Sequence, residues 1–307
     1  MGAGNDTVTT TTAAVGTGGS VAAGDGTADK IIMTDTLAAG ADGSSVFNSK
    51  FTGFEILQIS DALVEDALDL DGLNAVSTVI LAAGATTATI NNLISGGTVQ
   101  FNTTNSTGVT TINVKGAVGG VTDVLNLVIS NSGDVYAAAE IAAVNVETIN
   151  ITANDSVATG SAATVNTMTL SATSAKTITV SGNNGLTLTN TTATAVTSFD
   201  ATGVVGNSTL ASTFVAATTD TAANLAVTYT SANNTVAAAV SIKGGAGDDV
   251  LTGNSAIDTI LGGDGDDAIS GVAGNESSLQ NPRNPHKTSH FCAIAVHQIP
   301  HKTLFEE

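Results

Sequence analysis

The sequence is poor in several residue types, and each shortage excludes a class of protein. Among 307 residues there is one cysteine, Cys292, so no disulfide can form within the chain. Only 8 Lys and Arg residues stand against 27 Asp and Glu residues, which gives a net charge of −19. We expect no nucleic-acid partner, because phosphate binding needs a basic surface. A hard divalent cation is the more natural counterpart of such a chain.

Long apolar runs are also missing. No apolar stretch reaches about 18 residues, so no membrane-spanning helix is expected. The first ten residues, MGAGNDTVTT, lack the basic region and the apolar region of a secretory signal peptide.

Histidine is absent from the first 277 residues, and its absence argues against catalysis. It removes the HExxH zinc site and the Ser–His–Asp triad, and no GxSxG motif is present. The carboxylates Glu55, Glu140 and Glu147 could in principle serve a glycosidase, but we interpret them as surface residues at strand edges. We therefore predict that the protein is not an enzyme.

The composition changes sharply near residue 277. All three prolines, all four histidines, the only arginine and Cys292 lie in the segment 277–307. We interpret this segment as an appended or out-of-frame, disordered tail, and the alternative is a native, weakly ordered C-terminus. Its histidines and Cys292 match no standard zinc-ligand spacing.

The body of the chain, residues 24–243, consists of short β-type runs that are separated by Gly, Asn, Asp and Ser. Several runs alternate apolar residues with Thr, Asn or Lys, which is the pattern of a strand with one buried face. The clearest examples are 54–60, 110–116, 125–130, 147–152, 168–172, 176–182, 186–190 and 240–244. Only the segments 63–73 and 135–144 could make a short helix or a coil crossing.

The spacing and composition of these runs predict an all-β fold of stacked short strands. Runs that begin at 168, 176, 186 and 197 are about ten residues apart, which favours a β-solenoid or a parallel β-roll. An elongated β-sandwich array is the alternative. Tryptophan is absent and aromatic residues make up 3% of the chain, which suits a narrow solenoid interior that is filled by Val, Ile, Leu and Ala.

Near the end of this body, three units of nine residues follow one another: GGAGDDVLT (244–252), GNSAIDTIL (253–261) and GGDGDDAIS (262–270). A fourth unit, GVAGNESSL, spans 271–279 but matches the nine-residue pattern poorly. The sixth position carries Asp249, Asp258 and Asp267, and the eighth carries Leu251, Ile260 and Ile269. Each unit thus predicts a glycine-rich turn with oxygen ligands, followed by a short strand with one inward side chain.

Stacked turns of this kind bring like charges together, which is unfavourable unless a cation lies between them. Ligands that are all oxygen atoms suit Ca²⁺ best, whereas Mg²⁺ demands a stricter octahedron. We therefore expect Ca²⁺ as the cofactor of the segment 244–276, which should be disordered without it.

The units resemble the RTX family of calcium-binding nonapeptides, GGxGxDxUx. The resemblance implies a parallel β-roll in which units one and three stack on one side, and units two and four on the other. It implies a Ca²⁺ ion between the turns 244–249 and 262–267, with Asp249 and Asp267 as ligands. The glycines that would shape these turns are Gly245, Gly247, Gly263 and Gly265.

The second side of this roll departs from the family pattern. Unit two has Asn254 and Ala256 in place of glycine, and unit four has Glu276 in place of aspartate. The site that contains Asp258 is therefore expected to be weaker or empty.

The same motif returns at the N-terminus. GAGNDTVT (2–9) fits positions two to nine of a nonapeptide, which makes Asp6 a candidate ligand. We interpret this as a chain that begins inside a repeat of a longer protein, with 1–23 as a partial repeat and linker. GDGTADKIIM (24–33) is a looser relative in which Asp25 and Asp29 are weak calcium candidates.

The phrases FTGFEILQIS (51–60) and NVETINITAND (145–155) resemble bacterial S-layer and related surface proteins that carry RTX repeats. This resemblance implies an extracellular, calcium-dependent lattice or coat on the bacterial cell surface. It also implies type I secretion and contact with cell-surface polysaccharide. The tail 277–307 is unlike the export signal of such proteins. The alternative function is an RTX-type adhesin that binds a surface glycan or protein, but the few aromatic residues favour the self-assembling coat.

Overall fold

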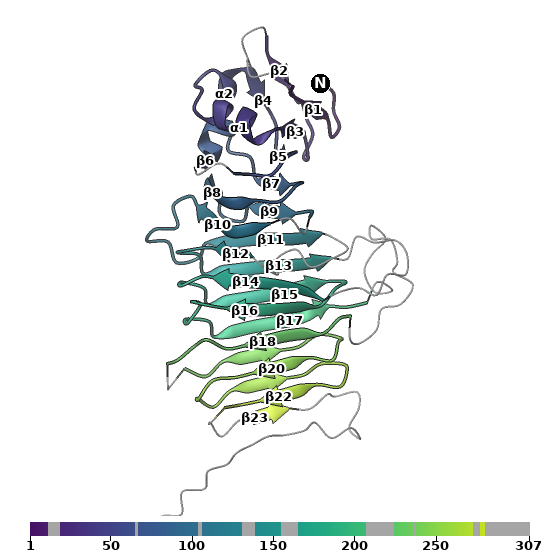
Figure 1. Ribbon diagram of the computed structural model, residues 1–307, viewed down its shortest axis with the longest axis vertical. Coiled ribbons are helices and arrows are strands. Elements are labelled where there is room, and N and C mark those ends of the chain that lie inside the picture. Colours follow the sequence, from purple (N-terminus) through teal and green to yellow (C-terminus); the bar gives the residue numbers. More distant parts are fainter. Residues whose placement is uncertain are drawn as a thin grey trace, which may run out of the picture.

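The computed structural model describes residues 1–11, 19–64, 67–103, 106–130, 139–154, 165–206, 224–235 and 238–272, and the backbone of 277–279. Within these ranges the molecule is an elongated stack of short parallel strands (Figure 1). Two large sheets run along the stack, and every strand pair within them is parallel. The arrangement is that of a β-solenoid, and the β-sandwich alternative is wrong because a sandwich is built from antiparallel strands.

From β5 onward the chain places successive strands in alternate sheets, so each coil adds one strand to each sheet. The twelve-stranded sheet contains, in spatial order, β1 (Thr7–Thr9), β3 (Lys30–Met33), β5 (Ile56–Ile59), β7 (Thr78–Leu81), β9 (Thr98–Phe101), β11 (Val124–Ser130), β13 (Thr148–Asn154), β15 (Thr177–Gly182), β17 (Ser198–Val204), β19 (Ser241–Lys243), β21 (Thr259–Leu261) and β23 (Ser277–Leu279).

The nine-stranded sheet contains β6 (Leu68–Asp69), β8 (Thr86–Leu93), β10 (Thr107–Val114), β12 (Ala139–Ala142), β14 (Asn166–Ser171), β16 (Leu186–Asn190), β18 (Val227–Thr230), β20 (Val250–Thr252) and β22 (Ala268–Ser270). A small third sheet pairs β2 (Val21–Ala22) with β4 (Phe51–Thr52). All eight runs that the sequence predicted as strands contain strands of the two large sheets. Both sheets also continue without a break across residue 243.

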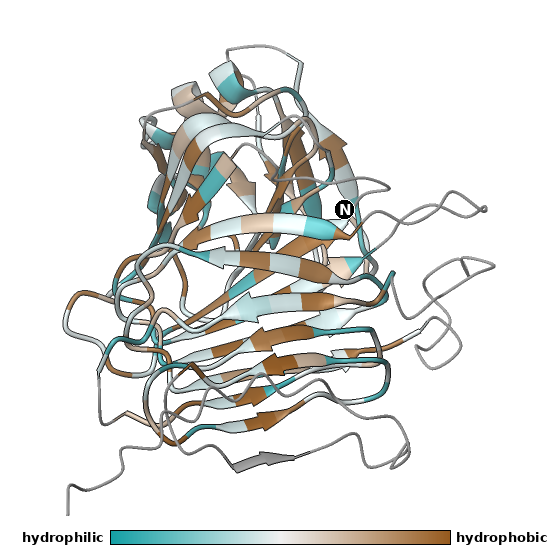
Figure 2. Cartoon of the chain, turned by 60° about the horizontal axis from the view of Figure 1, so that its bottom comes forward, coloured by the Kyte–Doolittle hydropathy of each residue, from teal (hydrophilic) through white to brown (hydrophobic). Residues whose placement is uncertain are grey.

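The core is built from ladders of side chains that the parallel register stacks on one another. One such ladder follows the twelve-stranded sheet through Leu125, Ile149, Ile178, Phe199, Ile242 and Ile260, all of them buried. Figure 2 shows the same alternation of hydrophobic and polar residues along the strands. Phe199 stacks on Tyr229 of the opposite sheet, with ring centroids 3.9 Å apart. Thr, Ser and Asn fill most of the outward positions.

Two helices that the sequence did not predict, and a 3₁₀ helix within the segment 63–73, cover the N-terminal edge of the nine-stranded sheet. α1 (Asp35–Asp42) begins after Thr34, whose side chain accepts a hydrogen bond from the Leu37 N–H. α2 (Phe47–Lys50) carries Phe47, which stacks on Phe51. α1 packs on β6 and on the 3₁₀ helix η1 (Leu70–Leu73). No helix in the described ranges is long and apolar enough to cross a membrane.

The two segments with helical expectations differ in outcome. The described part of 63–73 forms β6 and then the short helix η1, whereas the described part of 135–144 forms the strand β12. The alanine-rich segment becomes a strand because Ile141 enters the buried ladder and β10 and β14 supply hydrogen-bond partners on both sides. Tertiary pairing here overrides local helix propensity.

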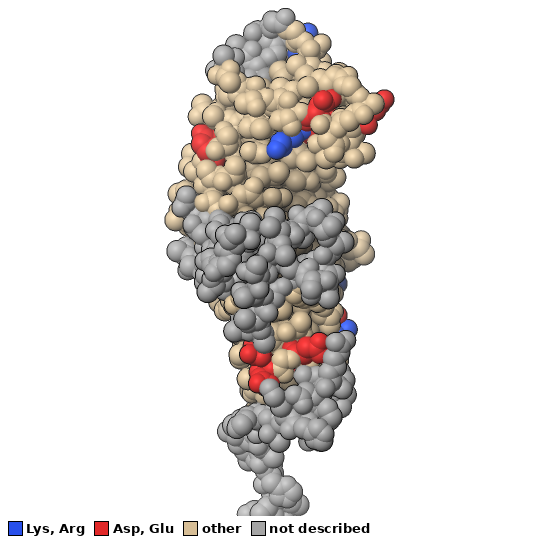
Figure 3. All heavy atoms as spheres, turned by 90° about the vertical axis from the view of Figure 1, so that its right-hand side faces the viewer, with Lys and Arg blue, Asp and Glu red and all other residues tan. Residues whose placement is uncertain are grey.

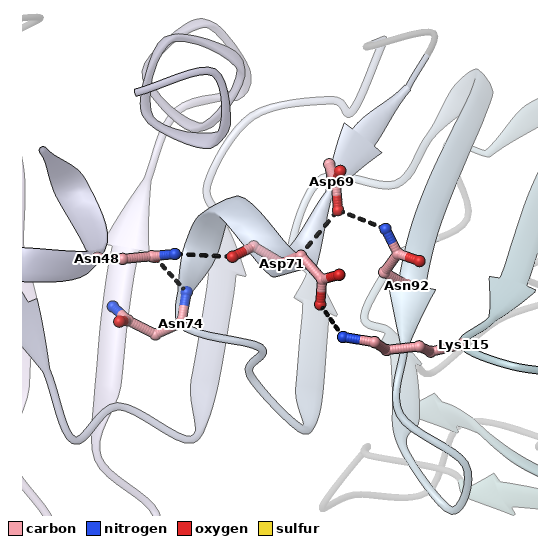
Figure 4. Close-up of polar contacts among 6 residues, drawn as sticks. All are labelled: Asn48, Asp69, Asp71, Asn74, Asn92 and Lys115. Carbon is pink, nitrogen blue, oxygen red and sulfur yellow. Dashed lines mark hydrogen bonds and ion pairs between the residues drawn. The ribbon is translucent and has the colours of Figure 1, made fainter. Parts of the chain in front are cut away.

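Polar contacts join this helical cap to the solenoid (Figure 4). The Asn48 side-chain amide donates to the Asp71 carbonyl oxygen at 2.7 Å. Asp69 accepts a hydrogen bond from Asn92 at 2.8 Å, and the Asp71 carboxylate pairs with Lys115 at 2.6 Å. The cap therefore covers an edge strand that would otherwise expose unpaired backbone groups.

The close stacking of the coils predicts that a corner glycine is essential. Gly182 has a φ of 123°, and a Cβ there would overlap the carbonyl oxygen of Ala153 in the preceding coil. We expect Gly182→Ala to lower the free energy of unfolding by more than about 1 kcal/mol, as measured by urea denaturation. Gly40→Ala is the control, because Gly40 lies in α1 with open space around it and the change should stabilise the helix by up to about 1 kcal/mol. Equal losses in the two variants would contradict this view of the corner.

Candidate metal centre

The glycine–aspartate turns lie directly on one another at the C-terminal end of the stack. Unit one ends in β20 and unit three in β22, and these strands pair with Val250 opposite Ala268. Unit two ends in β21, which pairs with β23 on the other sheet. The predicted stacking of units one and three on one side, and of units two and four on the other, is therefore confirmed for the strands.

The glycines of unit three permit this close stacking. Gly263 and Gly265 have φ values of 108° and 117°, which L-amino acids with a side chain rarely adopt. A Cβ at either position would overlap the carbonyl oxygen of Gly245 or Gly247 in the turn beneath. The Asp264 N–H in turn donates to the Gly245 carbonyl oxygen at 2.9 Å. The two turns are thus held in contact by their backbones.

Asp249 lies at the centre of the stacked turns and is fully buried. One carboxylate oxygen accepts a hydrogen bond from the Gly245 N–H of its own turn, and the other accepts one from Val227 at the start of β18, both at 2.7 Å. The Asp249 N–H donates to the Asp267 carboxylate at 3.1 Å. Each aspartate therefore joins its own turn to the coil before it.

This arrangement raises the pKa of both Asp249 and Asp267. Burial raises the pKa of the Asp249 carboxyl to about 7, although the hydrogen bonds from Val227 and Gly245 act against the rise, and nearby acidic charges add to it. Burial also raises the pKa of Asp267, and the charges of Asp248, Asp266 and Asp264 contribute. Figure 3 shows acidic residues gathered near the C-terminal end of the molecule. This crowding of negative charge favours a cation.

On the other side of the roll, Asp258 makes the corresponding contacts. It is buried and accepts hydrogen bonds from the N–H groups of Val240 at 2.9 Å and Asn254 at 2.6 Å. The Asn254 side chain also accepts a hydrogen bond from Ala256, so an amide side chain shapes this turn where unit one has glycines. Glu276, its expected counterpart in unit four, lies outside the described residues.

At the N-terminus, the structure brings the other predicted ligand, Asp6, beside Asp29. The Asp6 N–H donates to the Asp29 carboxylate at 2.6 Å, and the Asp6 carboxylate accepts from the Gly2 N–H at 3.0 Å. Asp25 donates its N–H to the Gly2 carbonyl oxygen at 3.3 Å. The turn 2–6 thus lies on the turn 24–29, much as unit one lies on unit three.

Sequence reasoning missed the roles of Glu55 and Glu147, which it places on the surface, whereas Glu147 is buried and Glu55 half-buried. Glu55 directly precedes β5, and its carboxylate accepts a hydrogen bond from the Asp29 N–H at 2.9 Å. Glu147, which precedes β13, accepts one from Asp123 at 3.0 Å. The available signal was positional, because an acidic residue stands immediately before each of these strands of the twelve-stranded sheet.

The chemistry of the ligands fits Ca²⁺ in the turns 244–249 and 262–267, since carboxylate and carbonyl oxygens are the ligands that these turns offer. Within the described ranges, no three His, Cys, Asp or Glu side chains converge on one point. Backbone carbonyls would therefore have to complete the coordination. The tail histidines and Cys292 lie outside the described residues. Comparison of the chain with protein-family models and with curated proteins found no match.

The raised pKa of Asp249 predicts how stability depends on pH without metal. An aspartate in an unfolded chain loses its proton near pH 4, whereas folded Asp249 keeps it to about pH 7. The folded state then binds more protons across this window, so the free energy of unfolding falls as the pH rises through it. Asp267 acts in the same direction.

We therefore expect the thermal midpoint in EDTA to fall between pH 4 and pH 7, and to fall less steeply in Asp249→Asn. Asp71→Asn, at an exposed carboxylate in the N-terminal half, should keep the wild-type slope. Identical slopes in all three proteins would show that Asp249 ionises normally.

Proposed function

We propose that this protein is a calcium-dependent extracellular structural protein, a rod that assembles into a bacterial surface layer or coat. The observation that carries the proposal is the stacking of the acidic turns 244–249 and 262–267 around buried Asp249. In the absence of a cation these turns hold like charges at close range. Bound Ca²⁺ would neutralise them and bridge two coils.

The carboxylates of Asp249 and Asp267, with carbonyl oxygens of the same turns, would hold this ion. Of the ion pairs between described residues, Lys115–Asp71 and Lys243–Asp200, neither involves Asp249 or Asp267. Asp267 is only half-buried, so its carboxylate is open to an ion from solution. Asp258 would contribute a weaker site on the other side of the roll.

The outer faces of the rod support a role in assembly. On the twelve-stranded sheet, a column of hydroxyl side chains follows the register through Thr148, Thr177, Ser198, Ser241 and Thr259. Beside it, Asn150 donates to Asn126 at 2.8 Å and accepts from Thr179 at 2.6 Å. A long, regular polar face of this kind can contact another copy at many equivalent points, which suits lateral self-association better than capture of one small ligand. A non-catalytic role is consistent with such a surface.

Calcium binding is tested by thermal unfolding of the full chain during titration with Ca²⁺. We expect the midpoint to rise with Ca²⁺, by the equivalent of about 2.7 kcal/mol at a concentration of 100 times the dissociation constant, and much less with Mg²⁺. Asp267→Asn should lose most of this rise, whereas Asp71→Asn should keep it. An equal rise in both variants would overturn the assignment of the C-terminal turns.

Assembly is tested separately by light scattering and electron microscopy of the same samples. Ordered particles that grow only with Ca²⁺ would support the coat. A protein that gains stability with Ca²⁺ but stays monomeric would overturn the coat and favour the adhesin.

A further inference from the structure

We propose a second divalent-cation site at the opposite end of the rod, on the buried carboxylate of Asp29. Asp6 and Glu55 lie in the coils before and after it, and backbone carbonyl oxygens would complete the coordination. The inference deepens the proposed calcium dependence, but it rests on different residues. Glu55 belongs to no nonapeptide, and Asp29 lies in a turn that departs from that pattern.

The strongest observation is an unpartnered oxygen on a buried side chain. Asp29 is fully buried, and its Oδ1 accepts a hydrogen bond from the Asp6 N–H at 2.6 Å. Its Oδ2 is equally buried but has no hydrogen-bond partner. A buried carboxylate oxygen that lacks a partner is costly, and such a group calls for an ion or another ligand.

The charges around Asp29 favour a cation. The register aligns Thr7 with Lys30 and Lys30 with Ile56, so the residues before them, Asp6, Asp29 and Glu55, occupy three successive coils. Neighbouring strands lie about 4.8 Å apart, which brings like charges close together. Neither ion pair of the described residues includes any of these carboxylates. The nearby Lys30 ammonium instead donates to Gln58 at 3.1 Å.

The turn around Asp29 is already held in shape. The side-chain oxygen of Asn5 accepts hydrogen bonds from the N–H groups of Thr27 at 3.3 Å and Ala28 at 3.2 Å. The Asp29 carboxylate lies against Gly26, where a Cβ would overlap both of its oxygens. An ion that enters here would meet oxygen atoms in a preorganised turn, and carboxylate and carbonyl oxygens are the ligands that Ca²⁺ and Mg²⁺ prefer.

A matched position elsewhere in the same sheet has similar contacts but lacks the full burial of Asp29. Asp123 precedes β11, donates its N–H to Glu147 at 3.0 Å and lies against Gly120, as Asp29 does with Glu55 and Gly26. Asp123, however, is only half-buried. Lys176 follows Glu147 in the same column, where its N–H donates to the Glu147 carbonyl oxygen. Asp123→Asn is therefore the control for Asp29→Asn.

The test uses the full chain with Asp249→Asn, Asp258→Asn and Asp267→Asn, which removes the carboxylate ligands of both C-terminal sites. In this background we expect isothermal titration calorimetry with Ca²⁺, or with Mg²⁺, to detect one remaining site. Adding Asp29→Asn should weaken that site by about tenfold or more, because a charged ligand is lost while the acceptor for Asp6 is kept. Adding Asp123→Asn should leave the affinity unchanged.

Unchanged affinity in Asp29→Asn would overturn the site, as would equal weakening by Asp123→Asn. If Asp29→Asn does not fold by circular dichroism, Glu55→Gln decides, since it removes a charge but still accepts from Asp29. Weaker binding supports the site, and wild-type affinity overturns it. Loss of all binding in the triple-variant background would refute this inference alone, whereas undiminished binding there would refute the C-terminal assignment alone.

Discussion

The structure depends on continuous backbone hydrogen bonding between coils, because no strand is long enough to be stable by itself. All strands of the described chain have only two to eight residues, and each strand inside the two large sheets gains its partners from the coil before and the coil after it. The corners must therefore stack as closely as the strands do. That requirement explains why glycine occupies corner positions such as Gly182 and Gly263, where a Cβ would overlap the neighbouring coil.

The same requirement explains why acidic residues stand at the corners. At several corners the N–H of a strand's first residue, or of the residue just before it, donates to a carboxylate of the next coil. Asp249 accepts from Val227, Asp258 from Val240 and Asp29 from Asp6. Because one acceptor follows another along the stack, hydrogen bonding gathers negative charge in columns. A cation that offsets this charge would stabilise the stack without changing its backbone.

Much of the repeating part of the fold could be predicted from the sequence. Alternation of apolar residues with threonine located the strands, because that signal is local, and the resemblance to the RTX nonapeptides implied which units stack. The sheet that each strand joins and the register of the ladders depend on contacts between distant residues. The helix α1 was missed because its signal is short, consisting of the Thr34 cap and one turn of apolar residues.

The candidate site could be predicted only in part, for the same reason. The nonapeptides pointed to Asp249, Asp258 and Asp267, and the N-terminal fragment of the motif pointed to Asp6. The contact between Glu55 and Asp29 spans 26 residues and follows from the register alone. Likewise, the unpartnered oxygen of Asp29 depends on how the turns 2–6 and 24–29 pack on each other, which no short motif records.

The most direct measurement is amide hydrogen exchange of the full chain with and without Ca²⁺, read at the turns 244–249 and 262–267 and at Val227. If a cation holds these turns together, exchange should slow there with Ca²⁺, with little change when Mg²⁺ is used. Exchange that is the same in Ca²⁺, Mg²⁺ and EDTA at these amides would contradict a structural role for the ion. The carboxylates would then serve only as hydrogen-bond acceptors for the corners.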